Sequence, residues 1–369
     1  MLARRLVHRS LGEGGSATRE GGTGWRLLTG LLATLAIVAS AQAPVVQWLP
    51  QASGVTVRLR GISAISPQVA WASGANGTLL RTVDGGAAWT KLPTPQGAEK
   101  LDFRDIDAVN NRVAYALSIG SGETSRIYKT ADAGTTWTLQ FANTDPKVFL
   151  DAMAFRDADH GFAFSDSVDG QFVILSTANG GTSWERIPAD RLPPALPGEG
   201  AFAASGTNVA VFGANHVWIG TTASRVLRSS DGGRTWAIAT TPIATGNATG
   251  IFSIAFKDAV LGVVLGGDYM NESQAGDNAA FTSDGGATWT RSKGISGFRS
   301  VAAWVPGTRT MIAIGPAGAD RSTDDGQSWE PVVMNLAAGF DAFSFAPGTT
   351  VGWASGSGGR ISRLAVSRP

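Results

Sequence analysis

The chain has 369 residues, no Cys, 48 Gly and 12 Trp, and only 16% of its residues are charged. Its formal net charge of +1 lacks the basic excess of a nucleic-acid-binding protein, and the absence of Cys excludes disulfide bonds. Abundant turn residues, without sustained helical periodicity after the N-terminus, favour an all-β protein. We therefore expect no nucleic-acid partner.

Residues 1–41 have the pattern of a secretory signal peptide. Five Arg residues precede an apolar run over residues 27–39, and Ala39-Ser40-Ala41 offers small residues for cleavage. The run is too short to span a bilayer comfortably, so we expect cleavage before Gln42 and a periplasmic or secreted protein. An uncleaved membrane anchor is the alternative. Removal of the five Arg and two Glu of this leader changes the formal charge from +1 to −2.

An eight-residue motif then recurs six times, with Asp or Asn at its third position, Gly at its fifth and Trp at its eighth. Each copy follows a short apolar run, which predicts a hairpin turn. The short polar side chain can accept hydrogen bonds from turn amides, Gly accepts a positive φ, and the Trp can pack under the turn. We call these the six Asp turns and expect them to be structural. Their residues are Asp84 and Trp89, Asp132 and Trp137, Asn179 and Trp184, Asp231 and Trp236, Asp284 and Trp289, and Asp324 and Trp329.

The spacing of the Asp turns predicts the architecture. Their Trp residues are 48, 47, 52, 53 and 40 residues apart, as in four-stranded propeller blades. A second motif, which is clearest from Trp71 to Arg81, occurs seven times, and its last copy has no Asp turn after it. Trp48 lies 41 residues before Trp89, so residues 45–49 can supply the missing outer strand. The sequence thus predicts a monomeric, seven-bladed all-β propeller over residues 42–369, closed by its N-terminal strand.

Each blade should begin with an innermost strand, and seven such starts can be aligned. In a four-stranded blade these starts lie on the face opposite the Asp turns, together with long loops such as residues 266–278. Loops of this kind commonly carry function. The seven starts are residues 59–62, 103–106, 149–152, 201–204, 251–254, 298–301 and 340–343.

Four of these seven segments belong to blades that are neighbours in the closed ring, and the second residue of each of the four is charged. Arg60, Arg104 and Arg299 could form a cationic cluster for a carboxylate, a phosphate or an acidic peptide, because guanidinium presents a planar fork of donors. We expect Asp268 and Tyr269 of the long loop to shape specificity there. The alternative is purely structural, with the Arg residues neutralised in a rim of salt bridges. The carboxylates available for that network are Asp341, Asp105 and Asp151.

The Asp turns resemble the Asp boxes, or BNR repeats, of sialidases, in which the boxes lie away from the catalytic centre. Sialidases also use an Arg triad, with a Tyr nucleophile paired with Glu and a separate Asp acid. Tyr269, with Asp268 and Glu272 nearby, is the candidate for such chemistry, so a secreted glycoside hydrolase is the alternative function. The sialidase Phe/Tyr-Arg-Ile-Pro start motif is not evident. Metal and nucleophile motifs are absent too, and we expect no catalytic residue, metal or cofactor.

A second resemblance covers the whole chain after the leader. Phe103-Arg104-Asp105-Ile106, the stretch from Gly198 to Asn208, Gly267-Asp268-Tyr269 and the Asp turns are similar to exported propellers of the photosystem II stability and assembly factor type. This resemblance implies a seven-bladed, non-catalytic scaffold that binds protein. A photosynthetic partner does not follow from it, since such relatives also occur in organisms that do not photosynthesise.

Overall fold

The computed structural model describes residues 46–333 and 339–367, so the expected leader lies outside the described residues. Strands make up nearly all of the regular structure. The exceptions are three one-turn 3-10 helices, and none of the helices in the described part is long and apolar enough to cross a membrane. These short helices are η1 (Gly122–Thr124), η2 (Ala189–Arg191) and η3 (Ser357–Gly359).

Seven four-stranded antiparallel sheets confirm the predicted seven-bladed propeller. In each blade the first strand of the sheet is innermost and the fourth is outermost. Blade 1 contains β2 (Leu59–Ala64), β3 (Ala70–Gly74), β4 (Thr78–Thr82) and β5 (Thr90–Lys91), and blade 2 contains β6 (Asp102–Ala108), β7 (Ala114–Ile119), β8 (Arg126–Thr130) and β9 (Thr138–Ala142). Blade 3 contains β10 (Leu150–Phe155), β11 (Gly161–Val168), β12 (Gln171–Thr177) and β13 (Glu185–Arg186), and blade 4 contains β14 (Val209–Phe212), β15 (His216–Gly220), β16 (Arg225–Ser229) and β17 (Ala237–Thr240). Blade 5 contains β18 (Thr249–Phe256), β19 (Gly262–Asp268), β20 (Ala279–Thr282) and β21 (Thr290–Arg291), and blade 6 contains β22 (Val301–Trp304), β23 (Met311–Gly315), β24 (Gly318–Ser322) and β25 (Glu330–Val332).

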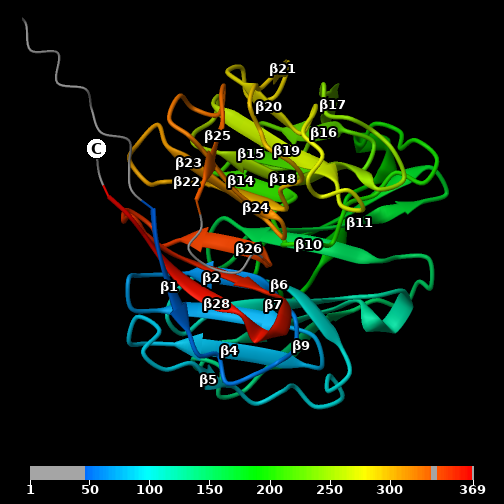
Figure 1. Ribbon diagram of the computed structural model, residues 1–369. Coiled ribbons are helices and arrows are strands. Elements are labelled where there is room, and N and C mark those ends of the chain that lie inside the picture. Colours follow the sequence, from blue (N-terminus) through cyan, green and yellow to red (C-terminus); the bar gives the residue numbers. More distant parts are fainter. Residues whose placement is uncertain (1–45, 334–338, 368–369) are drawn as a thin grey trace, which may run out of the picture. The chain divides into compact units, whose positions relative to one another are not determined.

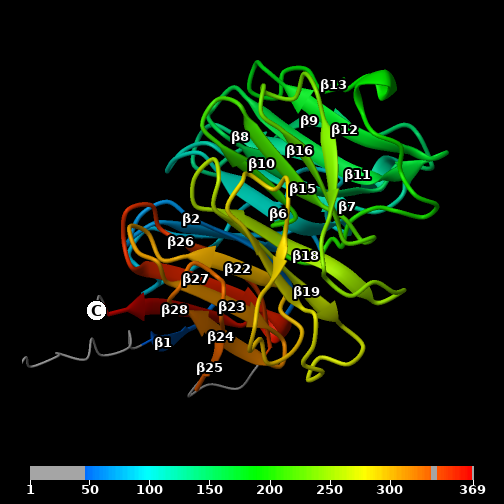
Figure 2. The same cartoon turned by 90° about the horizontal axis from the view of Figure 1, so that it is seen from above.

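Blade 7 closes the ring as predicted. It contains β26 (Phe340–Phe345), β27 (Val351–Gly356), β28 (Ile361–Val366) and, as its outermost strand, β1 (Val46–Gln51). Both views show blue β1 beside red β28 (Figures 1 and 2), and the two strands pair antiparallel over their full length. The Gln51 side chain strengthens this closure, because its oxygen accepts hydrogen bonds from the indoles of Trp89 at 2.9 Å and Trp353 at 3.1 Å.

The hydrophobic core lies mainly between blades. Each second strand is buried on both faces, and its large side chains pack against the adjoining blade. Trp71 of blade 1, for example, belongs to one apolar cluster with Phe103 and Tyr128 of blade 2. Burying apolar surface on both sides of a sheet is the main stabilising contribution in such a ring. This arrangement explains why the second strands are nearly continuous apolar runs.

The Asp turns connect neighbouring blades as well as neighbouring strands. In the second turn, the Thr136 amide donates to Asp132 Oδ1 at 2.9 Å, and the Gly134 amide donates to Thr130 Oγ1 at 2.9 Å. Gly134 has a φ of +87°, and a Cβ there would lie 3.2 Å from the ring of Trp71 in the preceding blade. A glycine is therefore needed both for the backbone conformation and for close approach to that blade.

The Trp residues of the Asp turns differ in how far they are buried. Only Trp89 and Trp329 are buried, whereas the other four are partly exposed at their edges. Trp236 contacts Phe162 of the preceding blade edge-on, with 6.3 Å between ring centroids. Trp236 is therefore only partly buried, and its edge stabilises a contact between blades 3 and 4.

Candidate functional site

A β-bulge recurs at the start of five innermost strands. The pairing register shifts between Leu59 and Gly61 in blade 1, and the equivalent shift occurs in blades 2, 3, 5 and 7. A bulge leaves one residue outside the ladder and re-aims its side chain. The residues skipped in these ladders are Arg60, Arg104, Asp151, Phe252 and Asp341.

Blade 4 departs from the expected pattern. Its innermost strand begins at Val209 rather than in residues 201–204, so that sequence prediction is wrong. The preceding segment instead crosses the centre of the ring: the carbonyl oxygens of Ala203 and Ala204 accept hydrogen bonds from the guanidiniums of Arg104 and Arg60 at 2.9 and 3.4 Å. Because these Arg residues belong to blades 2 and 1, residues 203–204 close the central channel as a plug. The innermost strand of blade 6 also begins later than expected, at Val301.

Above this plug lies a cavity of about 450 Å³ on the face that carries the strand starts. Four of the five bulge residues line it. Three guanidiniums therefore meet at one cavity, since Arg58 joins Arg60 and Arg104. The lining residues are Arg58, Arg60, Arg104, Phe202, Ala203, Ala204, Phe252, Tyr269, Glu272, Phe298, Ser300, Pro316 and Asp341.

The three guanidiniums differ in how completely they are neutralised. Arg58 makes a bidentate pair with Asp341, with nitrogen-oxygen distances of 2.8 and 2.7 Å, which raises the pKa of Arg58. Arg104 pairs with Asp102 at 2.9 Å. Arg60 has no carboxylate within 4 Å among the described residues, and burial beside Arg104 lowers its pKa to about 10. A charged Arg60 without an acidic partner is the group that an incoming anion would neutralise.

The opposite wall of the cavity is aromatic. Phe202 stacks on Phe252 with 3.8 Å between centroids and an interplanar angle of 4°. Tyr269 meets both rings edge-on at 6.1 and 6.0 Å, and Phe298 meets Phe252 at 4.6 Å and 79°. Guanidiniums on one wall and packed rings on the other give the cavity a polar and an apolar side. Such a cavity can hold an anionic group and an adjoining apolar group together.

Arg299 does not line this cavity. It is buried, its Nε donates to Asp320 at 2.7 Å, and its other nitrogens donate to Phe298 O and Ser296 Oγ at 2.7 and 2.5 Å. Burial lowers the pKa of Arg299 despite the neighbouring Asp320. The structure thus separates Arg299 from the other two predicted Arg residues and gives it a complete set of internal partners.

The carboxylates proposed to neutralise the Arg cluster have three different environments. Only Asp341 is part of it, through Arg58. Asp105 accepts a hydrogen bond from the Met153 amide at 2.7 Å, and Asp151 is buried beside the start of the plug. Burial raises the pKa of both Asp105 and Asp151 well above the usual value. Neither of them pairs with an Arg in the described part of the chain, so most of the expected salt-bridge rim is absent there.

The two loop residues predicted to shape specificity have separate positions. Tyr269 lines the cavity, whereas Asp268 folds back on its own loop and accepts a hydrogen bond from the Met270 amide at 2.8 Å. Met270 and Tyr269 are the exposed apolar residues at this rim. The loop therefore contributes apolar surface to the cavity, while Asp268 orders its turn.

The opposite end of the central channel carries two carboxyl groups in a largely apolar lining. A second cavity of about 350 Å³ below the plug is lined by Asp105, Asp107 and several hydroxyl groups. Asp107 accepts a hydrogen bond from the Phe155 amide at 2.7 Å. Among the residues described, no group of three or more His, Cys, Asp or Glu side chains is placed to hold a metal ion. The guanidiniums thus line one end of the channel and the two carboxyl groups the other.

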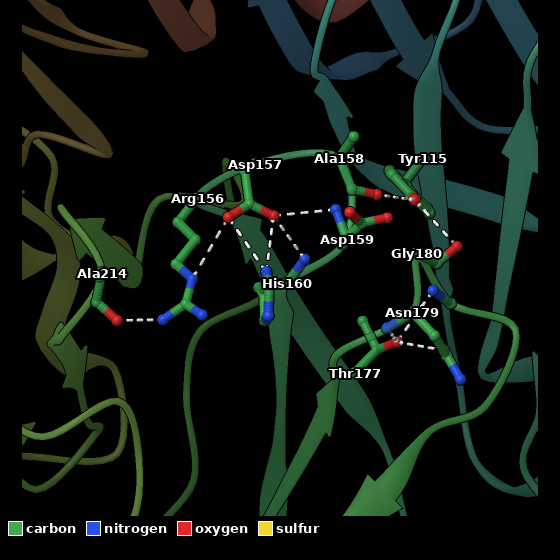
Figure 3. A network of polar contacts seen from close by, with 11 residues as sticks. Tyr115, Arg156, Asp157, Ala158, Asp159, His160, Thr177, Asn179, Gly180 and Ala214 are labelled. Atoms are coloured by element: carbon green, nitrogen blue, oxygen red, sulfur yellow. Dashed lines mark hydrogen bonds and ion pairs between the residues drawn. The ribbon is translucent and has the colours of Figure 1, made fainter.

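His160 belongs to a polar network on the face that carries the Asp turns (Figure 3). Its Nδ1 lies 2.9 Å from the Asp157 carboxylate, which also faces Arg156 at 3.5 Å. The third Asp turn is nearby, and its Asn179 oxygen accepts the Thr177 hydroxyl hydrogen bond at 3.0 Å in place of the usual carboxylate. These contacts all lie within blade 3, where His160 and Asp157 order the loop of residues 156–160.

Sequence reasoning missed Arg58 and the three Phe residues of the aromatic wall, although it did single out Tyr269. Charged residues two positions apart at a strand start are the local signal that could have found Arg58, which precedes Arg60 by two residues. The same spacing relates Asp102 to Arg104. Phe202 had no such local signal, because its position depends on the plug. The four rings come from blades 5 and 6 and from the plug segment, and only the closed ring brings them together.

No family model matches the chain, and no curated protein matches it. Solved structures do match the chain. One of YCF48 bound to D1 peptide is 17% identical with a TM-score of 0.62, covering 87% of this chain and 97% of that one. YCF48 from Cyanidioschyzon merolae is 16% identical with a TM-score of 0.63, covering 86% and 98%. The WD40 β-propeller domain of Doa1 is 11% identical with a TM-score of 0.60, covering 87% and 97%. At these identities the likeness shows a shared propeller fold.

Proposed function

We propose that this protein is a non-catalytic scaffold that binds a partner protein through a carboxylate-bearing peptide segment in the central cavity. The observation that carries the proposal is the meeting of Arg58, Arg60 and Arg104 with an aromatic wall in one open cavity. Such a site recognises a carboxylate by charge-assisted hydrogen bonds and an adjoining side chain by apolar contact. The peptide-bound YCF48 structure, which shares the fold, supports a peptide as the type of ligand.

The charge of the cavity indicates how large an anion it takes. Two of its three guanidiniums are already paired, Arg58 with Asp341 and Arg104 with Asp102, which leaves the Arg60 guanidinium in excess of the paired carboxylates. A single Asp or Glu side chain matches that excess better than a phosphate dianion. Electrostatic complementarity of this kind favours specificity and association rate as well as affinity. We therefore infer one essential acidic residue in the bound segment.

A random dodecapeptide display library, selected on the folded protein, tests this proposal. We expect enrichment of one Asp or Glu beside an apolar residue, and at least tenfold weaker binding of a selected peptide to the Arg60→Ala/Arg104→Ala variant. Substituting the acidic residue of the peptide by its amide should cause a similar loss. Arg186→Ala, on the outer strand β13, is the matched control and should bind normally. Selection without acidic enrichment, or equal binding by the double variant at an unchanged melting temperature, would reject the proposal.

The rival function, a secreted glycoside hydrolase, is favoured by one observation. Tyr269 and Glu272 line the same cavity as the three guanidiniums, a set of residue types that also suits sialidase chemistry. A panel of fluorogenic glycosides distinguishes the two functions. The scaffold predicts no turnover, whereas activity that disappears in Tyr269→Phe, in a variant that remains folded, would establish the hydrolase.

Export of the protein to the periplasm or outside the cell is part of the same proposal, and it is supported by the composition of residues 1–41. N-terminal sequencing of the protein from culture fractions provides the test. We expect a mature start near Gln42. Recovery of an intact Met1 in the cytosol would contradict export.

A further inference from the structure

A second hollow adjoins the central cavity on the same face. It has a volume of about 480 Å³ and lies between loops of blades 3, 4 and 5, and Phe202 lines both spaces. We call it the trough. Its other lining residues are Pro197, Gly198, Glu199, Thr222, Ala223, Thr245, Gly246 and Asn247. A bound peptide segment that leaves the cavity past Phe202 therefore enters the trough directly.

The trough presents no net charge. Its one ionisable residue, Glu199, is buried and accepts hydrogen bonds from the Thr221 hydroxyl at 2.7 Å and from the Leu196 amide at 2.8 Å, and it is paired with Arg225. Apart from Phe202 and Pro197, the remaining lining is small or polar and uncharged. Charged residues would lose hydration there without gaining a partner, whereas small uncharged residues fit.

The walls of the trough are held in place by hydrogen bonds between its loops. The Thr222 amide donates to Gly200 O at 2.9 Å, and the Gly200 amide donates to Thr222 Oγ1 at 3.0 Å. The exposed side chain of Leu196 lies next to Pro197 in this wall. A pre-formed hollow binds an extended chain with little loss of its own conformational entropy.

The geometry points to a two-part peptide site: the central cavity holds an acidic residue and its apolar neighbour, and the trough holds the next residues of the same extended segment, which are small and uncharged. This inference rests on the proposed function, because it assumes the carboxylate in the cavity. An extended chain advances about 3.3 Å per residue, so a dodecapeptide is long enough to occupy both spaces. The occupant is thus a linear segment of a partner protein rather than a free small anion.

The test uses a dodecapeptide selected from the display library and the same peptide cut to its acidic and apolar pair, both measured by fluorescence anisotropy. We expect the full peptide to bind at least tenfold more tightly than the pair. Ala223→Trp, which fills the trough, should remove this difference. Ala214→Trp, an exposed position in the same blade but on the face of the Asp turns, should retain it. Thr245→Trp fills the trough from another loop and replaces Ala223→Trp if that variant does not fold.

The possible results separate the two proposals. If neither peptide binds, the cavity does not take a carboxylate and the proposed function fails. If the pair binds as tightly as the full peptide, or if both trough variants keep the tenfold difference, the cavity acts alone and the two-part site is wrong. Loss of the difference in Ala223→Trp but not in Ala214→Trp establishes the trough.

Discussion

Replacing Asp107 by Asn should stabilise the protein at neutral pH and leave it unchanged in acid. Burial raises the pKa of Asp107 to about 6, although the hydrogen bond from the Phe155 amide acts in the opposite direction. The usual unfolded value is about 3.9, so folding favours the neutral acid. The wild-type protein therefore keeps its full stability below about pH 4 and loses part of it as pH rises through 6.

The magnitude of this effect follows from the size of the shift. Two pKa units correspond to about 3 kcal/mol, and because the Asp107 side chain remains partly exposed we expect about 1 to 2 kcal/mol. Asn retains an oxygen that can accept the Phe155 amide hydrogen bond, so the substitution removes the charge and preserves the contact. The free energy of unfolding of Asp107→Asn should thus equal that of the wild type at pH 4 and exceed it at pH 7.5.

Urea unfolding at pH 4, 5.5 and 7.5 measures the difference directly. Asp132→Asn supplies a control of opposite sign, because hydrogen bonds from the Thr136 side chain and amide lower the pKa of Asp132 to about 2. That carboxylate stabilises the fold above about pH 4, and its contribution is lost as pH falls through 2. A stability difference for Asp107→Asn that is constant with pH, or a destabilised variant at pH 7.5, would refute the reasoning.

Three further predictions concern stability. Trp236→Ala should lower the free energy of unfolding by about 2 kcal/mol in urea titration, because the ring is only partly buried where it packs against Phe162 and the apolar cluster of blades 3 and 4. A loss above about 4 kcal/mol would contradict this. Ala133→Gly should raise the free energy of unfolding by up to about 1 kcal/mol, since Ala133 has a φ of +67°, and a lower melting temperature would argue against backbone strain. Arg299→Ala should cost about 3 to 5 kcal/mol by leaving the buried Asp320 unpaired, and unchanged thermal unfolding would show that this pair is dispensable.

The sequence alone determined the blade count and the ring closure. Both depend on short-range chemistry repeated along the chain: a hydroxyl, an Asp or Asn and a Gly fold each turn from residues within eight positions, and apolar runs between turns define strands. The position of Trp48 relative to Trp89 was enough to predict that β1 completes blade 7, which the pairing with β28 confirms.

Only the tertiary structure decided which charged residues share the cavity. Arg60 and Arg299 occupy the same aligned position in the sequence. A bulge in blade 1 re-aims the Arg60 side chain toward the channel. Blade 6 has no register shift within its first strand pair, and its Arg299 side chain is bonded to Asp320 instead. A one-residue change in register reverses the direction of a side chain, and it depends on how neighbouring blades pack rather than on local composition. The plug shows the same limit, because Ala203 and Ala204 bond to Arg residues about 100 and 144 positions away in the chain. Contacts over such separations exist only once the ring is closed, and they place Phe202 where the cavity and the trough meet.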